Sequence, residues 1–176
     1  MPTLLSQLDP RWTERQIGTS GYKYFDGCVL FTAMHIYCAL HGLSLSTIEE
    51  FEQIVKNIDP DILNTFEASL THMKTLCEQL GLKVEYYSDY TQSNLQAVYD
   101  GLAAGKYAVA MFAPKYGTSN GHAAMIHGVK ANGELLIADS AFTPAETLDQ
   151  GEKTLRYAIA YQNGIHSSLD VYIVSR

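Results

Sequence analysis

The chain has 176 residues, of which 47% are hydrophobic and 18% are charged, and its formal net charge is -7. These values are typical of one globular domain, so we expect residues 1–176 to form a single domain around a substantial core. The acidic balance and the lack of a Lys/Arg cluster argue against nucleic acid and anionic membrane surfaces as main partners. The sequence contains no run of about 18 apolar residues, which a membrane-spanning helix would need, so we expect no membrane insertion.

The three cysteines, Cys28, Cys38 and Cys77, show no CxxC spacing. They predict neither a zinc site nor a disulfide framework, and a reducing compartment fits them best. The first residues lack the basic and apolar regions of a secretory signal. We therefore expect a cytoplasmic protein, or one delivered outside the cell without a conventional signal peptide. The sequence indicates no metal and no cofactor, and it leaves the oligomeric state open.

Residues 3–26 are typical of an extended, loop-rich arm with a turn signal at Asp9-Pro10. The only tryptophan, Trp12, is expected to anchor that arm to the body. The chain is organised around the next stretch, residues 27–42. Its apolar side chains recur at intervals of three and four residues, which predicts a buried helix that ends at Gly42. Cys28 falls in the first turn of this helix.

Polar and proline breaks divide the rest of the chain into further elements. We expect helices at 46–57, 61–80 and 91–104, the first with a capping box of Ser46 and Glu49. We expect strands at 82–87, 107–113, 122–129, 134–139 and 169–175, whereas residues 152–162 fit either a helix or a long strand. Because most helices precede most strands, the fold class is α+β, with the Cys28 helix packed on a C-terminal antiparallel sheet.

Cys28 lies where a helix N-terminus stabilises negative charge. The amides and the dipole there favour the thiolate, which is the nucleophilic form of cysteine. A buried structural cysteine is the alternative interpretation. Cys38 and Cys77 fall within apolar helical patterns, so we predict that both are core residues.

Asn132-Gly133 is the strongest hairpin signal in the sequence and predicts a type I′ turn. A hairpin centred there brings His122, at the start of one strand, and Asp139, at the end of the other, to the same end. A carboxylate fixes the tautomer of an imidazole, which can then take the proton of a thiol. The alternative interpretation is that His122 is a loop histidine and Asp139 a turn residue, neither with a catalytic role. His127 competes as the base, but its position on the same strand predicts that it faces the other side.

Four motifs carry a family resemblance: Gln7-Leu8-Asp9-Pro10-Arg11-Trp12, Gly27-Cys28-Val29-Leu30-Phe31-Thr32-Ala33-Met34, Gly121-His122 and Leu135-Leu136-Ile137-Ala138-Asp139-Ser140. Together they resemble papain-like cysteine peptidases, and in particular the soluble relatives of the peptidases that trim double-glycine leader peptides in bacteriocin exporters. Two features depart from the family pattern. Val29-Leu30-Phe31 replaces a Gly-Pro-type sequence, and Ser140 stands where proline often follows the aspartate.

The resemblance implies a papain-like fold and a cysteine peptidase or amide hydrolase that acts on a peptide or protein. Cys28 would be the nucleophile, His122 the base and Asp139 the residue that orients His122. The family's oxyanion glutamine precedes the cysteine. The motif favours Gln7, Gln16 is nearer in sequence, and both stay open. The alternatives are thiol-dependent acyl transfer, such as transglutamination or deamidation, and a non-enzymatic binding module with the same fold.

Overall fold

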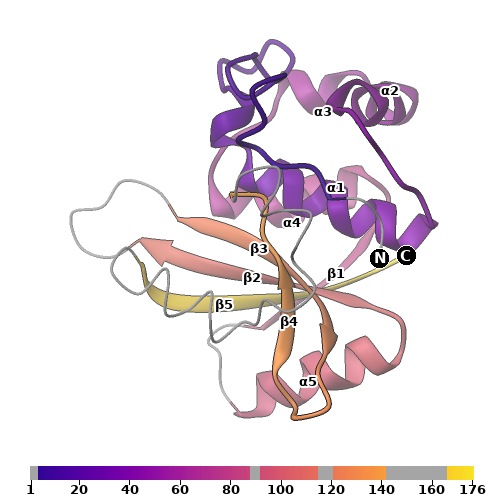
Figure 1. Cartoon of the computed structure of the whole chain (residues 1–176), viewed down its shortest axis with the longest axis vertical. Helices are drawn as coiled ribbons and strands as arrows, with labels where there is room; N and C mark the ends of the chain where they lie inside the picture. Colours follow the sequence, from indigo (N-terminus) through magenta and orange to yellow (C-terminus); the bar gives the residue numbers. More distant parts are fainter. Residues whose placement is uncertain (1–3, 88–91, 115–120, 142–165) are drawn as a thin grey trace.

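A computed structural model of the chain describes residues 4–87, 92–114, 121–141 and 166–176 (Figure 1). The fold is α+β, as expected, with one open five-stranded antiparallel sheet. The helices are α1 (Cys28–His41), α2 (Ile48–Ile58), α3 (Asp61–Asn64), α4 (Met73–Gln79) and α5 (Gln92–Ala103), with 3₁₀ turns at Tyr24–Asp26 and Leu70–His72. The strands are β1 (Lys83–Tyr87), β2 (Tyr107–Pro114), β3 (His122–Val129), β4 (Leu135–Ala138) and β5 (His166–Ser175).

The sheet has the order β1-β5-β2-β3-β4 and separates two hydrophobic cores. α1 and α4 cover one face, and α5 covers the other (Figure 1). Successive side chains of a strand point to opposite faces, and β3 shows the consequence. Ala123 and Met125 belong to the core that includes α1, whereas Ala124 and Ile126 pack with Val98 of α5.

α1 is the central helix, and its predicted start and end are confirmed. Gly42 adopts φ 66°, and its N–H donates to backbone carbonyls of the last turn. Every residue from Cys28 to Ile36 is buried. A helix buried on nearly all sides needs no polar face, which explains why its apolar pattern is almost continuous.

α2 forms where it was predicted, but its cap lies one residue later than expected. Thr47, not Ser46, is the N-cap, and its hydroxyl accepts from the backbone N–H of Glu50, whose carboxylate accepts from the N–H of Thr47. This register places Ile48 and Phe51 on the buried side of the helix. Packing of the apolar face therefore selects between two adjacent polar caps.

The single helix predicted at 61–80 is wrong, because the chain breaks between α3 and α4. The Thr65 hydroxyl donates to the carbonyl of Asp61 at 2.8 Å, and the Ser69 hydroxyl accepts from the N–H of Thr71 to begin a new turn. Phe66 is buried within the break. Side chains that bond the local backbone compete with a continuous helix in this way.

The hairpin between β3 and β4 is present, but its turn is not the expected type I′. The N–H of Gly133 donates to the carbonyl of Lys130, and the N–H of Lys130 donates to the carbonyl of Glu134. The loop therefore has three residues and places Gly133 at φ 86°, a geometry that favours glycine. A bulge at His127 also shifts the pairing of the two strands.

The longer loop and the bulge decide which residues lie near Asp139. A type I′ turn at Asn132-Gly133 would have placed Asp139 opposite Ile126. Continuing the observed pairing one residue beyond β4 places it opposite Ala124 instead. Asp139 therefore lies closer to His122 than a type I′ turn would have placed it.

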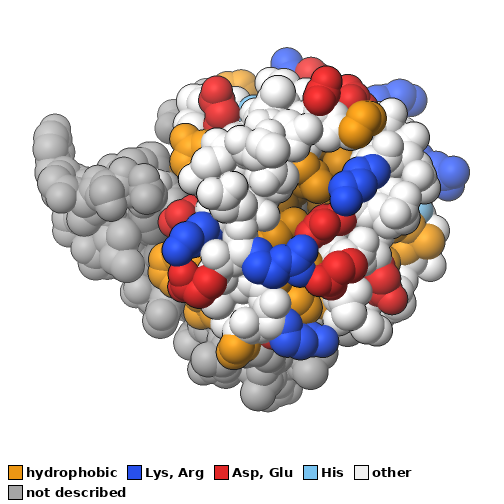
Figure 2. Space-filling model, turned by 90° about the horizontal axis from the view of Figure 1, so that it is seen from above, with side chains coloured by type: hydrophobic (Ala, Val, Ile, Leu, Met, Phe, Trp, Pro, Cys, Tyr) orange, Lys and Arg blue, Asp and Glu red, His pale blue; other side chains and the backbone are white. Residues whose placement is uncertain are grey.

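Charges of both signs are interspersed over the surface seen in Figure 2, with hydrophobic side chains between them. This view shows no extended basic area of the kind that nucleic acid requires. No helix within the described ranges is long and apolar enough to cross a membrane.

The sequence predicts two elements near the end of the chain. β5 begins three residues earlier than expected, and the element predicted at 152–162 lies outside the described residues.

Candidate active site

Cys28 begins α1 directly after a glycine that the chain requires. A Cβ at Gly27 would lie 2.9 Å from the carbonyl oxygen of Tyr24 and 3.3 Å from the ring of Phe31. The tight passage from the preceding 3₁₀ turn into α1 brings Cys28 to a pocket of about 630 Å³. Gln7, Gly121 and His122 line the same pocket.

The predicted contact between His122 and Asp139 is confirmed. Nε2 of His122 lies 2.8 Å from Oδ1 of Asp139, and both side chains are buried. The same carboxylate oxygen accepts the backbone N–H of Ala141 at 2.9 Å. The ring of Phe112 stacks on the imidazole with 6.2 Å between the ring centroids. These contacts hold the imidazole in one orientation and leave Nδ1 as its second hydrogen-bonding atom.

Three influences act on the charge of His122. Burial lowers its pKa, whereas the charge of Asp139 and hydrogen bonds with Asp139 and Cys28 raise it, and the net result lies well above the ordinary value. The imidazolium form is therefore favoured near neutral pH, at the pocket that the thiol of Cys28 also lines. A positive imidazolium beside a cysteine favours the reactive thiolate.

Gln7 is the glutamine that lies at this pocket. Its Nε2 donates to the carbonyl of Phe25 at 2.7 Å, and its Oε1 accepts from the hydroxyl of Ser140 at 2.7 Å. Gln16 is exposed, pairs with Lys23 in a β-bridge, and is not among the described residues that line the pocket. The geometry therefore separates the two candidates that the sequence leaves open.

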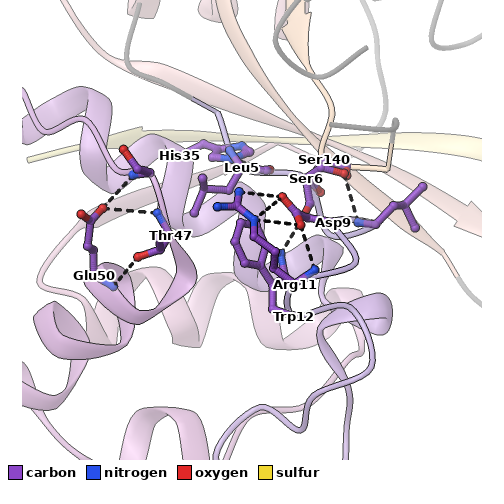
Figure 3. A network of polar contacts seen from close by, with 11 residues as sticks. Leu5, Ser6, Asp9, Arg11, Trp12, His35, Thr47, Glu50 and Ser140 are labelled. Carbon is purple, nitrogen blue, oxygen red and sulfur yellow. Dashed lines mark hydrogen bonds and ion pairs between the residues drawn. The ribbon is translucent and has the colours of Figure 1, made fainter. Parts of the chain in front are cut away.

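The N-terminal arm that carries Gln7 is firmly attached to the body (Figure 3). Trp12 is buried, as predicted for an anchor, and its Nε1 donates to the carbonyl of Ser6 at 2.8 Å. The backbone N–H and carbonyl of Leu5 each lie 3.1 Å from Nε2 of His35 on α1. The turn predicted at Asp9-Pro10 is present: the backbone N–H groups of Trp12 and Thr13 donate to the carbonyl of Asp9.

Two walls of the pocket come from segments without a clear sequence signal. One consists of residues 68–71, which lie in the break that the sequence predicted as helix. The other contains Tyr22, Phe25 and Asp26, of which Tyr22 is 37% and Phe25 52% exposed. Both aromatic side chains are therefore accessible at the pocket. Tyr24, which lies between them in the sequence, is buried instead, and its hydroxyl donates to Glu52.

Cys38, Cys77 and His127 are not among the described residues that line this pocket. Cys38 and Cys77 are core residues, as predicted, and burial raises the pKa of each thiol to about 12. His127 is the bulged residue of β3 and does not line the described pocket, and burial lowers its pKa. Among the described residues, no group of three His, Cys, Asp or Glu is placed to hold a metal ion.

No family model matches the chain, and no curated protein matches it. What the site can do is therefore argued from its own chemistry. A thiol at a helix N-terminus, a carboxylate-bound imidazole and a buried amide meet at one pocket. This combination can carry out nucleophilic attack on a carbonyl, proton transfer and stabilisation of an oxyanion.

Proposed function

We propose that the chain is a papain-like cysteine peptidase or amide hydrolase that acts on peptides or proteins. The observation that carries this proposal is the arrangement at the pocket. His122 bonds Asp139 through Nε2, and Cys28 lines the same pocket as His122. The order of a cysteine helix, a histidine strand and an aspartate at the end of the next strand also agrees with the family resemblance of the motifs.

Acylation begins when the thiolate of Cys28 attacks the carbonyl carbon of the scissile amide. A carbon–sulfur bond forms, and the carbonyl electrons move onto the oxygen. The intermediate collapses to a thioester when the carbon–nitrogen bond breaks and the imidazolium of His122 gives its proton to the leaving amine. Water then attacks the thioester carbon while His122 accepts a proton from it. The carbon–sulfur bond breaks, which releases the carboxylic acid and restores the thiolate–imidazolium pair.

Gln7 and the backbone N–H of Cys28 would stabilise the tetrahedral oxyanion. The first N–H groups of a helix lack intrahelical acceptors, so that of Cys28 suits this role. The side-chain amide of Gln7 has two hydrogens, and the bond to the carbonyl of Phe25 uses one. The second is then available to the oxyanion.

Asp139 has an orienting role in this mechanism. Its Oδ1 accepts from Nε2 of His122, which leaves Nδ1 for the thiol of Cys28. The backbone N–H of Ala141 donates to the same oxygen and helps to hold the carboxylate in place. Asp139 therefore keeps the imidazole in one tautomer and stabilises the imidazolium.

The experiment is labelling with a thiol-reactive, activity-based electrophile, followed by peptide mapping, and then a substrate profile measured on the unlabelled protein. We expect the label on Cys28 and turnover of peptide amides that the Cys28→Ala variant lacks. An added amine acceptor reports whether the acyl group passes to water or to an amine. A folded protein whose Cys28 resists the electrophile would contradict the proposal and leave a binding module.

A further inference from the structure

Ser140 holds the side chain of Gln7, although neither its residue type nor its position suggested this role. It is 1% exposed and directly follows Asp139. Its hydroxyl donates to Oε1 of Gln7 at 2.7 Å, and its carbonyl accepts the backbone N–H of Gln7 at 2.9 Å. The same carbonyl accepts the hydroxyl of Ser6 at 3.3 Å (Figure 3). Ser140 thus joins the N-terminal arm to the end of β4.

The two partners of the Gln7 side chain define the orientation of its amide. A backbone carbonyl can only accept, so the carbonyl of Phe25 requires Nε2 on its side. Oε1 then faces Ser140, whose hydroxyl is able to donate. With both ends of the amide bonded, the direction of its second N–H is set before a substrate binds.

We propose that Ser140 is a positioning residue for the oxyanion donor Gln7, an inference that rests on the proposed function. Adjacent residues at one strand end then hold two parts of the active site. Asp139 orients the imidazole of His122, and Ser140 orients the amide of Gln7. A proline at 140, as in the family pattern, has no hydroxyl to donate, so this chain uses a bond that such a sequence lacks.

The first experiment compares Ser140→Ala with the wild type on one peptide substrate. Loss of one oxyanion donor lowers kcat by about 10²- to 10³-fold, so we expect Gln7→Ala to fall in that range. Ser140→Ala leaves the donor in place but loosely held, and we expect a kcat about tenfold lower with KM nearly unchanged. Ser140→Thr retains a hydroxyl and should recover most of the loss.

A double-mutant cycle separates positioning from general damage. If Ser140 acts through Gln7, Ser140→Ala should cost nothing further in the Gln7→Ala background. Ser6→Ala is the matched control, because it removes a hydroxyl from the same contact without touching the Gln7 side chain. We expect it to change the unfolding temperature but not kcat. A wild-type kcat in Ser140→Ala, or an equal loss in both backgrounds, would overturn the proposal.

A second measurement does not depend on turnover. In the wild type the two side-chain amide hydrogens of Gln7 should give separate NMR signals that exchange slowly with solvent. In Ser140→Ala these signals should broaden and exchange faster, while those of Gln16 stay unchanged. Unchanged Gln7 signals would refute the role of Ser140. A wild type without turnover but with the expected Gln7 signals would refute the proposed function alone.

Discussion

Oδ1 of Asp139 lies 2.8 Å from Nε2 of His122, across the open end of the β3–β4 hairpin. This contact assigns one nitrogen of the imidazole to the carboxylate and leaves the other for Cys28. It also means that the charge state of the site depends on a pair of buried groups rather than on one residue. The predictions that follow test this pair, the thiol and the contacts that hold them.

Replacement of the three proposed groups should give unequal losses. Cys28→Ala should lower kcat by about 10⁴-fold or more, because no other group supplies the nucleophile, and His122→Ala should come close to it. Asp139→Asn should retain more activity, with a loss of about 10²-fold, because the imidazole can still visit the productive tautomer. Turnover is measured beside thermal unfolding. A folded Cys28→Ala protein with wild-type turnover would end the peptidase interpretation.

Alkylation should distinguish Cys28 from the other two thiols. Iodoacetamide at pH 6 should modify Cys28 first, because it lines the pocket together with His122, the proposed base. Cys38 and Cys77 should stay unmodified, since burial raises the pKa of each to about 12. Mass spectrometry of digested protein measures the three rates, and the unfolded chain, in which they should be similar, is the control. Equal rates in the folded protein would contradict the thiolate argument.

The ion pair of His122 should make stability fall as the pH rises. Its pKa in the folded protein is raised well above the ordinary value of about 6.5. The stabilisation is therefore fully present below about pH 6.5 and is lost as the pH rises through the folded pKa. One proton gives at most about 1.4 kcal/mol per pH unit. Denaturant unfolding between pH 6 and 9 measures this slope, and Asp139→Asn should flatten it.

Protonation of His35 should make the stability of the protein fall as the pH falls in the acidic range. Burial lowers its pKa to about 4, even though the backbone of Leu5 and the charge of Asp139 oppose this effect. Its contribution to stability is therefore present above about pH 6.5 and is lost as the pH falls toward 4. His35→Gln cannot become charged and should remove this part of the acid sensitivity. An unchanged slope in that variant, measured by urea unfolding, would show that His35 is not responsible.

Gly121 should tolerate no side chain. A Cβ there would lie 2.3 Å from Cδ1 of Leu70 and 2.9 Å from the carbonyl oxygen of Phe112. We expect Gly121→Ala to lower the free energy of unfolding by about 1 to 3 kcal/mol and to reduce turnover, because His122 is the next residue. Adding Leu70→Ala should relieve the cost only in part, since the Phe112 carbonyl belongs to the backbone. Full recovery in the double variant would show that Leu70 alone causes the clash.

Local sequence patterns were sufficient to predict several parts of the structure. The run of apolar residues and the glycine at its end defined α1, and the position of Cys28 in its first turn followed. The turn residues around Gly133 defined a hairpin and hence the neighbourhood of His122 and Asp139. These features depend on interactions between residues close in the chain, so they can be read without knowledge of the fold.

Long-range packing settled what local patterns left open. The three-residue loop and the bulge at His127 placed Ala138 opposite Met125, because a strand register also depends on what each face of the sheet buries. Gln7, rather than Gln16, lies at Cys28 because Ser140, more than a hundred residues away, bonds both its backbone and its side chain. Such contacts join residues that no sequence window contains, so only the folded chain reveals them.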